Sequence, residues 1–301
     1  MISSNKGALF AALSGLFYGL IGYFGLSVMN ANISAATMLF WRFFISSLAI
    51  LVLIAFNTNK EKTSFAEVFK VFFYGMAFYA TTSLLYFISA KYIGSGLAMV
   101  VFYTYPALIM IINYVLYQHR VNKIYYFALT VLFVGMLFLV EGSQIQFNVM
   151  GISIGLLSAL LYALYIVASK NSRVAPLLSG FYISFGSAFT CLITACIDHS
   201  FTIPTQFETL CNLLGIGIVC TALPIVLLLK GLKQISSLKA SILSVLEPVF
   251  VVFFGVVLLG ETINLLQGIG VVVILSGALL TLLNKQNEPP LMRQLAEEKV
   301  V

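Results

Sequence analysis

The sequence predicts an all-α, polytopic membrane protein, and three observations lead to this prediction. The chain of 301 residues is 61% hydrophobic and has a mean hydropathy of +1.05. Only 9% of its residues are charged, against about a quarter in a soluble domain. Apolar runs of roughly 20 residues recur along the whole sequence, and each is long enough to cross a bilayer as a helix. These features exclude a soluble enzyme, a nucleic-acid-binding protein and a disordered scaffold.

Each apolar run is predicted to be a helix and each polar break a loop, because a spanning segment must satisfy its own backbone hydrogen bonds. The first run lacks a small-residue cleavage site, so we expect it to be retained rather than removed as a signal peptide. The longest connections, 57–67 and 198–208, are too short for a domain outside the membrane. The ten predicted spans cover residues 7–28, 34–56, 68–89, 95–117, 123–140, 150–169, 177–197, 209–230, 237–259 and 264–283.

The distribution of basic residues predicts the orientation of these ten spans. An even number of spans places both termini on the same side. With that side cytoplasmic, 14 of the 16 basic residues fall at or near cytoplasmic helix ends, as the positive-inside rule requires. Lys91 faces outward, and Arg42 lies within a span. The expected location is therefore a bacterial cytoplasmic (inner) membrane, with both termini cytoplasmic. The outer loops hold acidic residues: Glu141, Asp198, Glu208 and Glu261.

An internal repeat divides the predicted spans into two halves of five. Residues 90–140 align with 232–282 at a shift of 142, and the first and sixth spans align at a shift of 144. Because five is odd, the second half enters the membrane from the opposite side, which is an architecture of alternating-access transporters. We therefore divide the chain into repeats 1–145 and 146–285 and a cytoplasmic tail, 286–301. The matched pairs include Lys91 with Lys233, Pro106 with Pro248, Gly135 with Gly277, Ser14 with Ser158 and Tyr18 with Tyr162.

Several short motifs resemble the EamA-type branch of the drug/metabolite transporter superfamily. The first half has Tyr105-Pro106 where the second half has Glu247-Pro248. The resemblance covers essentially the whole chain, and it implies two five-helix repeats and the transport of small organic metabolites. The motifs are Leu246-Glu247-Pro248, Leu259-Gly260-Glu261, Gln267-x-x-Gly270 with Gly277, and Phe40-Trp41-Arg42-Phe43.

Two ionisable residues lie clearly inside the predicted spans, Arg42 and Glu247. Such residues are costly in mid-membrane and usually face a bundle interior or a water-filled cavity. From the helical rise, Arg42 lies about a third of the way in from the outer face and Glu247 about two fifths from the inner face. We hypothesise that Glu247 contacts a substrate amine or carries a coupling proton, and that Arg42 contacts a carboxylate or phosphate. The alternatives are a structural pair, or an Arg42 side chain that reaches toward the headgroups.

Further candidate residues are prolines, tyrosines and one lysine. Pro106, Pro248 and Pro224 lie inside predicted helices, where each removes a backbone hydrogen bond and can kink the helix. Paired interruptions in two halves are typical of transporter binding sites. Among the tyrosines we select Tyr105, which aligns with Glu247, and the repeat mates Tyr18 and Tyr162. Lys91 is selected because it lies on the outer side, against the charge bias.

The sequence thus predicts a secondary transporter rather than an enzyme. The resemblance implies small metabolites, with amino acids or related compounds most often exported. An importer of a vitamin, nucleotide or other metabolite, and a channel-like facilitator, remain alternatives. A proton is the natural coupling ion if Glu247 titrates in a cavity, and membrane lipid surrounds the helices. No cofactor, metal or nucleic-acid partner is expected, since His119 and His199 lie in opposite loops and no phosphate-binding motif is present. A homodimer is left open.

Overall fold

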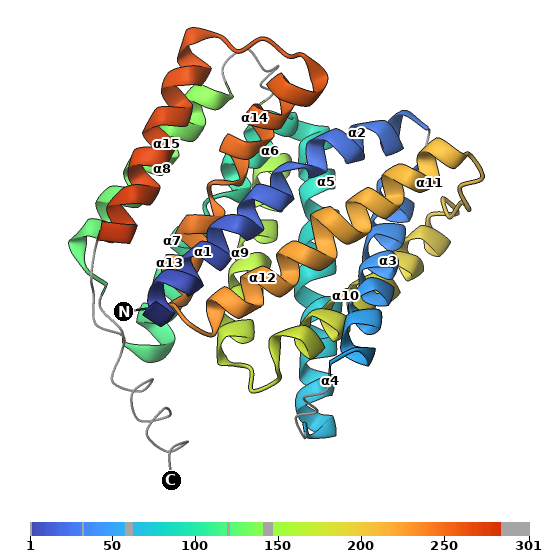
Figure 1. The fold of residues 1–301 in the computed structure, drawn as a ribbon. Coiled ribbons are helices and arrows are strands. Elements are labelled where there is room, and N and C mark those ends of the chain that lie inside the picture. The colour runs from blue at the N-terminus through green and yellow to red at the C-terminus, as the bar shows by residue number, and fades with distance from the viewer. Residues whose placement is uncertain (1, 32, 58–62, 119–120, 141–146, 284–301) are drawn as a thin grey trace.

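A computed structural model describes residues 2–31, 33–57, 63–118, 121–140 and 147–283, and within these ranges every regular element is a helix (Figure 1). Nine of the described helical segments are long and apolar enough to cross a membrane, and a tenth apolar helix, Lys123–Leu139, is shorter. The prediction of an all-α polytopic protein is confirmed. The predicted tail, 286–301, and the predicted boundary at 145 and 146 lie outside the described residues.

Half of the predicted spans, namely the first, third, fourth, eighth and ninth, consist of more than one helical element. In the first half, the elements are α1 (Ile2–Gly19), α2 (Ile21–Asn30), α3 (Ala35–Ala55), α4 (Phe65–Phe73), the π-helix η1 (Tyr74–Ala80), α5 (Thr81–Ile93), α6 (Ser95–Phe102), α7 (Tyr105–Tyr117) and α8 (Lys123–Leu139). In the second half, they are α9 (Val149–Asn171), α10 (Pro176–Ile197), α11 (Phe207–Leu214), the π-helix η2 (Gly215–Ala222), α12 (Leu223–Leu232), α13 (Ser237–Ser244), α14 (Glu247–Leu259) and α15 (Leu265–Leu283).

Two of the predicted proline kinks are found at helix starts. Pro106 and Pro248 each lie in the first turn of a new helix, α7 and α14, whereas Pro224 lies just after the π-helix η2 inside the continuous helical segment Phe207–Leu232. A proline fits at a helix start because the first N–H groups of a helix have no partner within the helix. The fourth and ninth predicted spans are therefore broken into two helices each, which places helix ends in the middle of the bundle.

Four helix pairs form the frame of the bundle: α3 with α10, α8 with α15, α5 with α9, and α1 with α12. Glycines also allow α10 to lie close against α4 and η1. A Cβ atom at Gly75 would collide with the backbone of Ile183 on α10, and one at Gly186 would collide with the carbonyl of Phe72 on α4. Small residues at helix crossings are typical of membrane bundles, where van der Waals packing replaces the hydrophobic effect.

The interior between the four pairs is lined by α1, α3, η1, η2, α9 and the two broken spans. Large apolar side chains face outward over much of the bundle, among them Phe69, Phe127 and Val272. The interior holds a large apolar core as well, and a smaller number of polar side chains is buried within it.

Candidate functional site

Arg42 lies deep inside the bundle on α3. Ser34 begins this helix by accepting a hydrogen bond from the Thr37 N–H at 3.1 Å, and Arg42 follows about two turns later. The side chain is only 7% exposed, and its Nε donates to the Thr221 hydroxyl at 2.7 Å. Thr221 in turn donates to the carbonyl of Ile216 at 2.7 Å. The guanidinium therefore points into the protein, not toward the headgroups.

Glu247 is the first residue of α14, directly after the break at Val245 and Leu246. Its carboxyl interacts with the hydroxyl of Tyr103, which lies at the matching break between α6 and α7. Val245 is fully buried and Val249 only 7% exposed, whereas Glu247 itself retains intermediate exposure. Glu247 is therefore less enclosed than Val245 and Val249 on either side of it.

Arg42 and Glu247 face the same region without touching each other. The charge of each acts on the other and on Tyr79. Within the part of the chain that the structure describes, however, the ion pair closer than 4.0 Å is that of Lys70 with Glu67, outside the site. Two opposite charges that share a buried region but are not joined can each bind an oppositely charged group of a ligand.

Six tyrosines fill the space around these two charges, and we call them the tyrosine cluster. The ring centroids of Tyr105 and Tyr162 are 4.7 Å apart, and those of Tyr79 and Tyr165 are 4.8 Å apart. The hydroxyls of Tyr18 and Tyr79 are hydrogen-bonded at 2.9 Å. All six side chains are at most 7% exposed, so the cluster is part of the protein interior. Its members are Tyr18, Tyr79, Tyr103, Tyr105, Tyr162 and Tyr165.

Both halves of the chain contribute to the cluster. Tyr105 donates from the first half to the carbonyl of Ser241 on α13 at 3.1 Å. The backbone of α1 lies close against the break before Glu247, since a Cβ at Gly15 would lie 3.3 Å from the Ser244 oxygen and 3.4 Å from the Glu247 nitrogen. The site is therefore assembled at the boundary between the halves.

Three buried hydroxyls lack a hydrogen-bond partner among the described residues: those of Ser14, Tyr165 and Ser169. Ser14 lies one turn before Tyr18 on α1, and Ser169 one turn after Tyr165 on α9. Buried polar groups are nearly always paired, with protein or with water. These hydroxyls therefore indicate places where water or a polar ligand is held beside the cluster.

The structure brings together five of the residues selected from the sequence, namely Arg42, Glu247, Tyr18, Tyr105 and Tyr162. Pro106 and Pro248 lie next to Tyr105 and Glu247, whereas Pro224 follows η2 three residues after Thr221. Lys91 lies exposed near the end of α5 and does not join the cluster.

Four residues of the site were not selected from the sequence, and one of them is Tyr79 on η1. Tyr165 lies three residues after Tyr162, a spacing that puts both on one face of a helix. Tyr103 precedes Tyr105 at the helix break. Thr221 lies in the π-helix η2, which no sequence pattern indicated. No group of three or more His, Cys, Asp or Glu side chains in the described ranges is placed to hold a metal ion.

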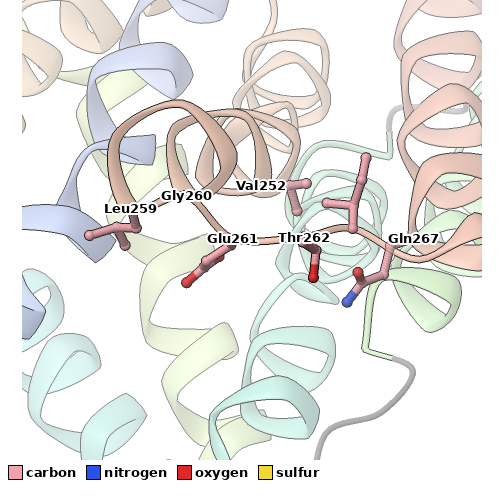
Figure 2. A pocket seen from close by; sticks show the side chains of 7 residues that line it. Val252, Leu259, Gly260, Glu261, Thr262 and Gln267 are labelled. Carbon is pink, nitrogen blue, oxygen red and sulfur yellow. The ribbon is translucent and has the colours of Figure 1, made fainter.

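A separate pocket lies at the far end of α14, beside the 260–264 loop (Figure 2). Its polar groups are occupied in ending one helix and beginning the next. Asn264 accepts from the Gln267 N–H at 2.7 Å, and Gln267 accepts from the Asn264 N–H at 3.1 Å. The Glu261 carboxyl lies against Gly255. We assign this pocket to helix capping and not to the site. Its lining residues are Val252, Leu259, Gly260, Glu261, Thr262, Ile263 and Gln267.

Comparison with known proteins finds two curated relatives that are similar over part of the sequence and a solved structure that is similar in fold. The chain is 35% identical over 133 residues to an uncharacterized transporter of Archaeoglobus fulgidus. These 133 residues cover 43% of this chain and 47% of that protein. Over 55 residues the chain is 40% identical to the uncharacterized transporter YcbK of Bacillus subtilis, 18% of each chain. The chain thus matches about half of the length of the first of these curated relatives and less than a fifth of the second.

A solved crystal structure has the same fold, with a TM-score of 0.78 over 92% of this chain and 98% of its own, at 18% identity. The model of the EamA-like transporter family matches the chain twice, at residues 5–141 and 149–283. These two matches together cover nearly the whole sequence. The chain belongs to the EamA-like transporter family.

Proposed function

We propose that this protein is a secondary transporter that carries a small organic metabolite across a bacterial cytoplasmic membrane by alternating access. The observation that carries the proposal is the arrangement of Arg42 and Glu247. These opposite charges are buried in the bundle, act on the same tyrosine, and are not joined to each other. Burying two unjoined charges is costly, and a ligand that carries both signs offsets that cost when it binds.

An inverted repeat of two five-helix halves is part of the proposal. Two observations support it: the family model matches the chain once in each half, and the packing of the helices is reciprocal. The first span packs on the eighth through α1 and α12, and the sixth packs on the third through α9 and α5. The second and seventh spans pack on each other through α3 and α10, as do the fifth and tenth through α8 and α15.

The proposed repeat also relates the helix interruptions. The π-helices η1 and η2 occupy the third and eighth spans. The breaks before Tyr105 and Glu247 occupy the fourth and ninth, at residues that align in the sequence. Gln118 and Gly260, which also align, each end a helix in the left-handed conformation, at φ of 51° and 69°. We propose ten spans on this basis, with Lys123–Leu139 as the shortest.

The proposed orientation places both termini in the cytoplasm. Its support is the excess of lysine and arginine on that side, together with the arrangement in Figure 1, where α1 begins and α15 ends toward the same side of the bundle. We call this side the inner end below.

We propose that the ligand is an amino acid or a related compound and that it is exported. Arg42 would bind its carboxylate, since a guanidinium presents several donors to a planar anion. Glu247 would bind its amine or exchange a proton with it, and the tyrosine cluster would contact its apolar part. Saturable counterflow, in which unlabelled substrate on one side drives labelled substrate against its gradient, distinguishes such a carrier from a channel.

The experiment that tests this proposal compares metabolites inside and outside cells that express the wild type, Glu247→Gln or Glu208→Gln. Glu208 is an exposed carboxylate in the first turn of α11 and serves as the matched control. We expect one class of compound to redistribute with the wild type and with Glu208→Gln, and not with Glu247→Gln. Equal redistribution by all three proteins would remove Glu247 from the proposed site.

A further inference from the structure

Two lysines tie the inner ends of α9 and α12 together. Lys233, the residue directly after α12, donates from its Nζ to the carbonyl of Ser172, the residue directly after α9. Lys170, in the last turn of α9, donates in return to the carbonyls of Leu232 at 2.7 Å and Ile235 at 2.9 Å. Cations at helix C-termini are favourable because the last carbonyls have no partner within the helix. The two helix ends are thus joined reciprocally.

The surrounding contacts close the inner end as well. α7 and α9 both pack against α13. Asn113 on α7 donates to the Ser237 hydroxyl at 3.1 Å, and Asn171 on α9 donates to the Tyr117 hydroxyl at 2.8 Å. Below the tyrosine cluster, the side chain of Ser169 is only 3% exposed. A route from the site to the inner end is therefore closed in this conformation.

The corresponding helices at the outer end are arranged differently. The counterpart of the second half of α9 is α2, which is separated from α1 by an interruption at Leu20, whereas α9 is continuous. Among the described residues α2 makes no comparable packing with α5 or α6, and α6 makes none with α14. The inner contacts α9–α12, α9–α13 and α7–α13 thus have no outer equivalents of the same extent, although α2 does pack on α14 and α11. Among the described residues, these helices are packed more extensively at the inner end than at the outer end.

The contacts that anchor both ends are nevertheless the same in each half. A Cβ at Gly7 would meet Gln234 and Ile235, and a Cβ at its repeat mate Gly151 would meet Tyr92 and Ile93. Lys91 is the repeat mate of Lys233 and lies beside the second of these contacts. Lys233 reaches the end of α9, whereas Lys91 is exposed and has no hydrogen bond in the described part of the chain.

We propose that Lys91 and Lys233 are alternating latches, an inference that rests on the transport cycle proposed above. Lys233 holds the inner end closed by binding the carbonyl of Ser172, directly after α9. When the inner end opens, α2 closes against α5, and Lys91 binds the carbonyl that corresponds to Ser172, that of Val28. This role explains why a lysine stands on the outer side against the charge bias. Each lysine stabilises one of two conformations, so removing it shifts the population toward the other.

The test measures how fast a single cysteine at the inner route is alkylated. The four native cysteines, Cys191, Cys196, Cys211 and Cys220, are replaced with alanine, and Ser169→Cys is introduced as the reporter. Membrane vesicles are treated with N-ethylmaleimide, which reacts with the thiolate form of cysteine. Because a thiol ionises readily only where water reaches it, the rate of alkylation reports the access of water to the reporter cysteine. Val167→Cys, at a position 6% exposed on the same helix end, is a second reporter should the first variant not be inserted.

We expect the two lysine variants to change the alkylation rate in opposite directions. Lys233→Met should raise it about tenfold, the change that corresponds to losing one hydrogen bond from a charged group. Lys91→Met should lower it, because the inward-open conformation loses its latch. The double variant should return toward the wild-type rate. Lys233→Arg, which keeps a cationic donor, and Lys230→Met, which alters an exposed lysine one turn earlier on α12, should leave the rate unchanged.

An unchanged or raised rate in Lys91→Met would overturn the proposal, as would an unchanged rate in Lys233→Met. These results are distinguishable from a failure of the proposed function. If neither reporter is alkylated in the wild type or in Lys233→Met, the inner end never opens, and both the latches and alternating access are wrong. If the wild type is alkylated and the lysine variants do not move the rate in opposite directions, only the latches are wrong.

Discussion

Arg42 on α3 and Thr221 on η2 are joined by a hydrogen bond of 2.7 Å from the guanidinium Nε to the threonine hydroxyl. The bond crosses from the first half of the chain to the second, and the same guanidinium also interacts with Tyr79 of the tyrosine cluster. The π-helix at Thr221 places this hydroxyl inward, since π-turns shift the helix face and occur frequently at functional sites. The charge that we assign to substrate binding therefore depends on a residue of the other half.

Replacing Thr221 with valine tests this dependence. Thr221→Val keeps the side-chain volume but removes the acceptor of Arg42, so we expect substrate affinity to fall by about tenfold, in line with a hydrogen bond to a charged group. Thr281→Val is the matched control, because Thr281 is equally buried and bonds only within its own helix, to Ala278. Affinity is measured from the concentration dependence of transport. Wild-type affinity in Thr221→Val would show that Arg42 does not need this partner.

Arg42→Lys should fail to restore transport, although it keeps the positive charge. A lysine presents one compact ammonium in place of the planar guanidinium group with its several N–H donors. It cannot both donate to Thr221 and form two parallel hydrogen bonds to a carboxylate. We expect at least a tenfold loss of uptake or efflux at equal protein level in the membrane. Activity close to that of the wild type in Arg42→Lys would show that the positive charge at position 42 is sufficient and that the guanidinium geometry is not required.

Glycine substitutions at the helix crossings should destabilise the bundle. Gly75→Ala places a methyl group against the backbone of Ile183, which cannot move aside as a side chain can. Overpacking of this kind costs about 1–3 kcal/mol, so the protein in detergent should unfold at a lower temperature. Gly268→Ala, at a position with no atom within 4 Å of the added methyl, should leave the unfolding temperature unchanged. Equal unfolding temperatures for the two variants would contradict the described packing of η1 on α10.

Two tyrosines of the cluster should respond differently to loss of their hydroxyls. Tyr79→Phe leaves the hydroxyl of Tyr18 without its partner and should lower stability by about 1 kcal/mol. Tyr165→Phe removes a hydroxyl that has no partner in the described chain, so it should not lower stability. Any loss of transport in Tyr165→Phe would then reflect a lost contact with substrate or water. Thermal unfolding and transport are measured for both, and a clear loss of stability in Tyr165→Phe would refute this assignment.

Much of the fold follows from hydropathy alone, because each spanning segment must form its own hydrogen bonds. Nine of the ten predicted spans agree in approximate position with described helices that are long and apolar enough to cross a membrane, and the remaining one falls on the shorter helix Lys123–Leu139. The interruptions were less predictable. Pro106 and Pro248 mark two of them, but a proline does not reveal whether a helix kinks or restarts. The π-helix around Thr221 has no signal in the sequence, since it depends on how η2 packs against α3.

The charged part of the site could be read from the sequence because charge is rare in a span. Arg42 and Glu247 stand out for that reason, and Tyr105 follows from its alignment with Glu247. The tyrosines Tyr79 and Tyr165 could not be selected in the same way. The chain has 15 tyrosines, and aromatic residues are also common at membrane interfaces, so only the three-dimensional arrangement separates the buried ones from the rest.

Alternating access requires that the region between Arg42 and Glu247 open in turn to each side of the membrane. The most direct measurement places a single cysteine at Ser244, which is 3% exposed and precedes the break before Glu247. A membrane-impermeant thiol reagent is added to right-side-out and to inside-out vesicles. We predict modification from both sides, with excess substrate slowing it from each. Modification from one side alone, or from neither, would contradict alternating access at this site.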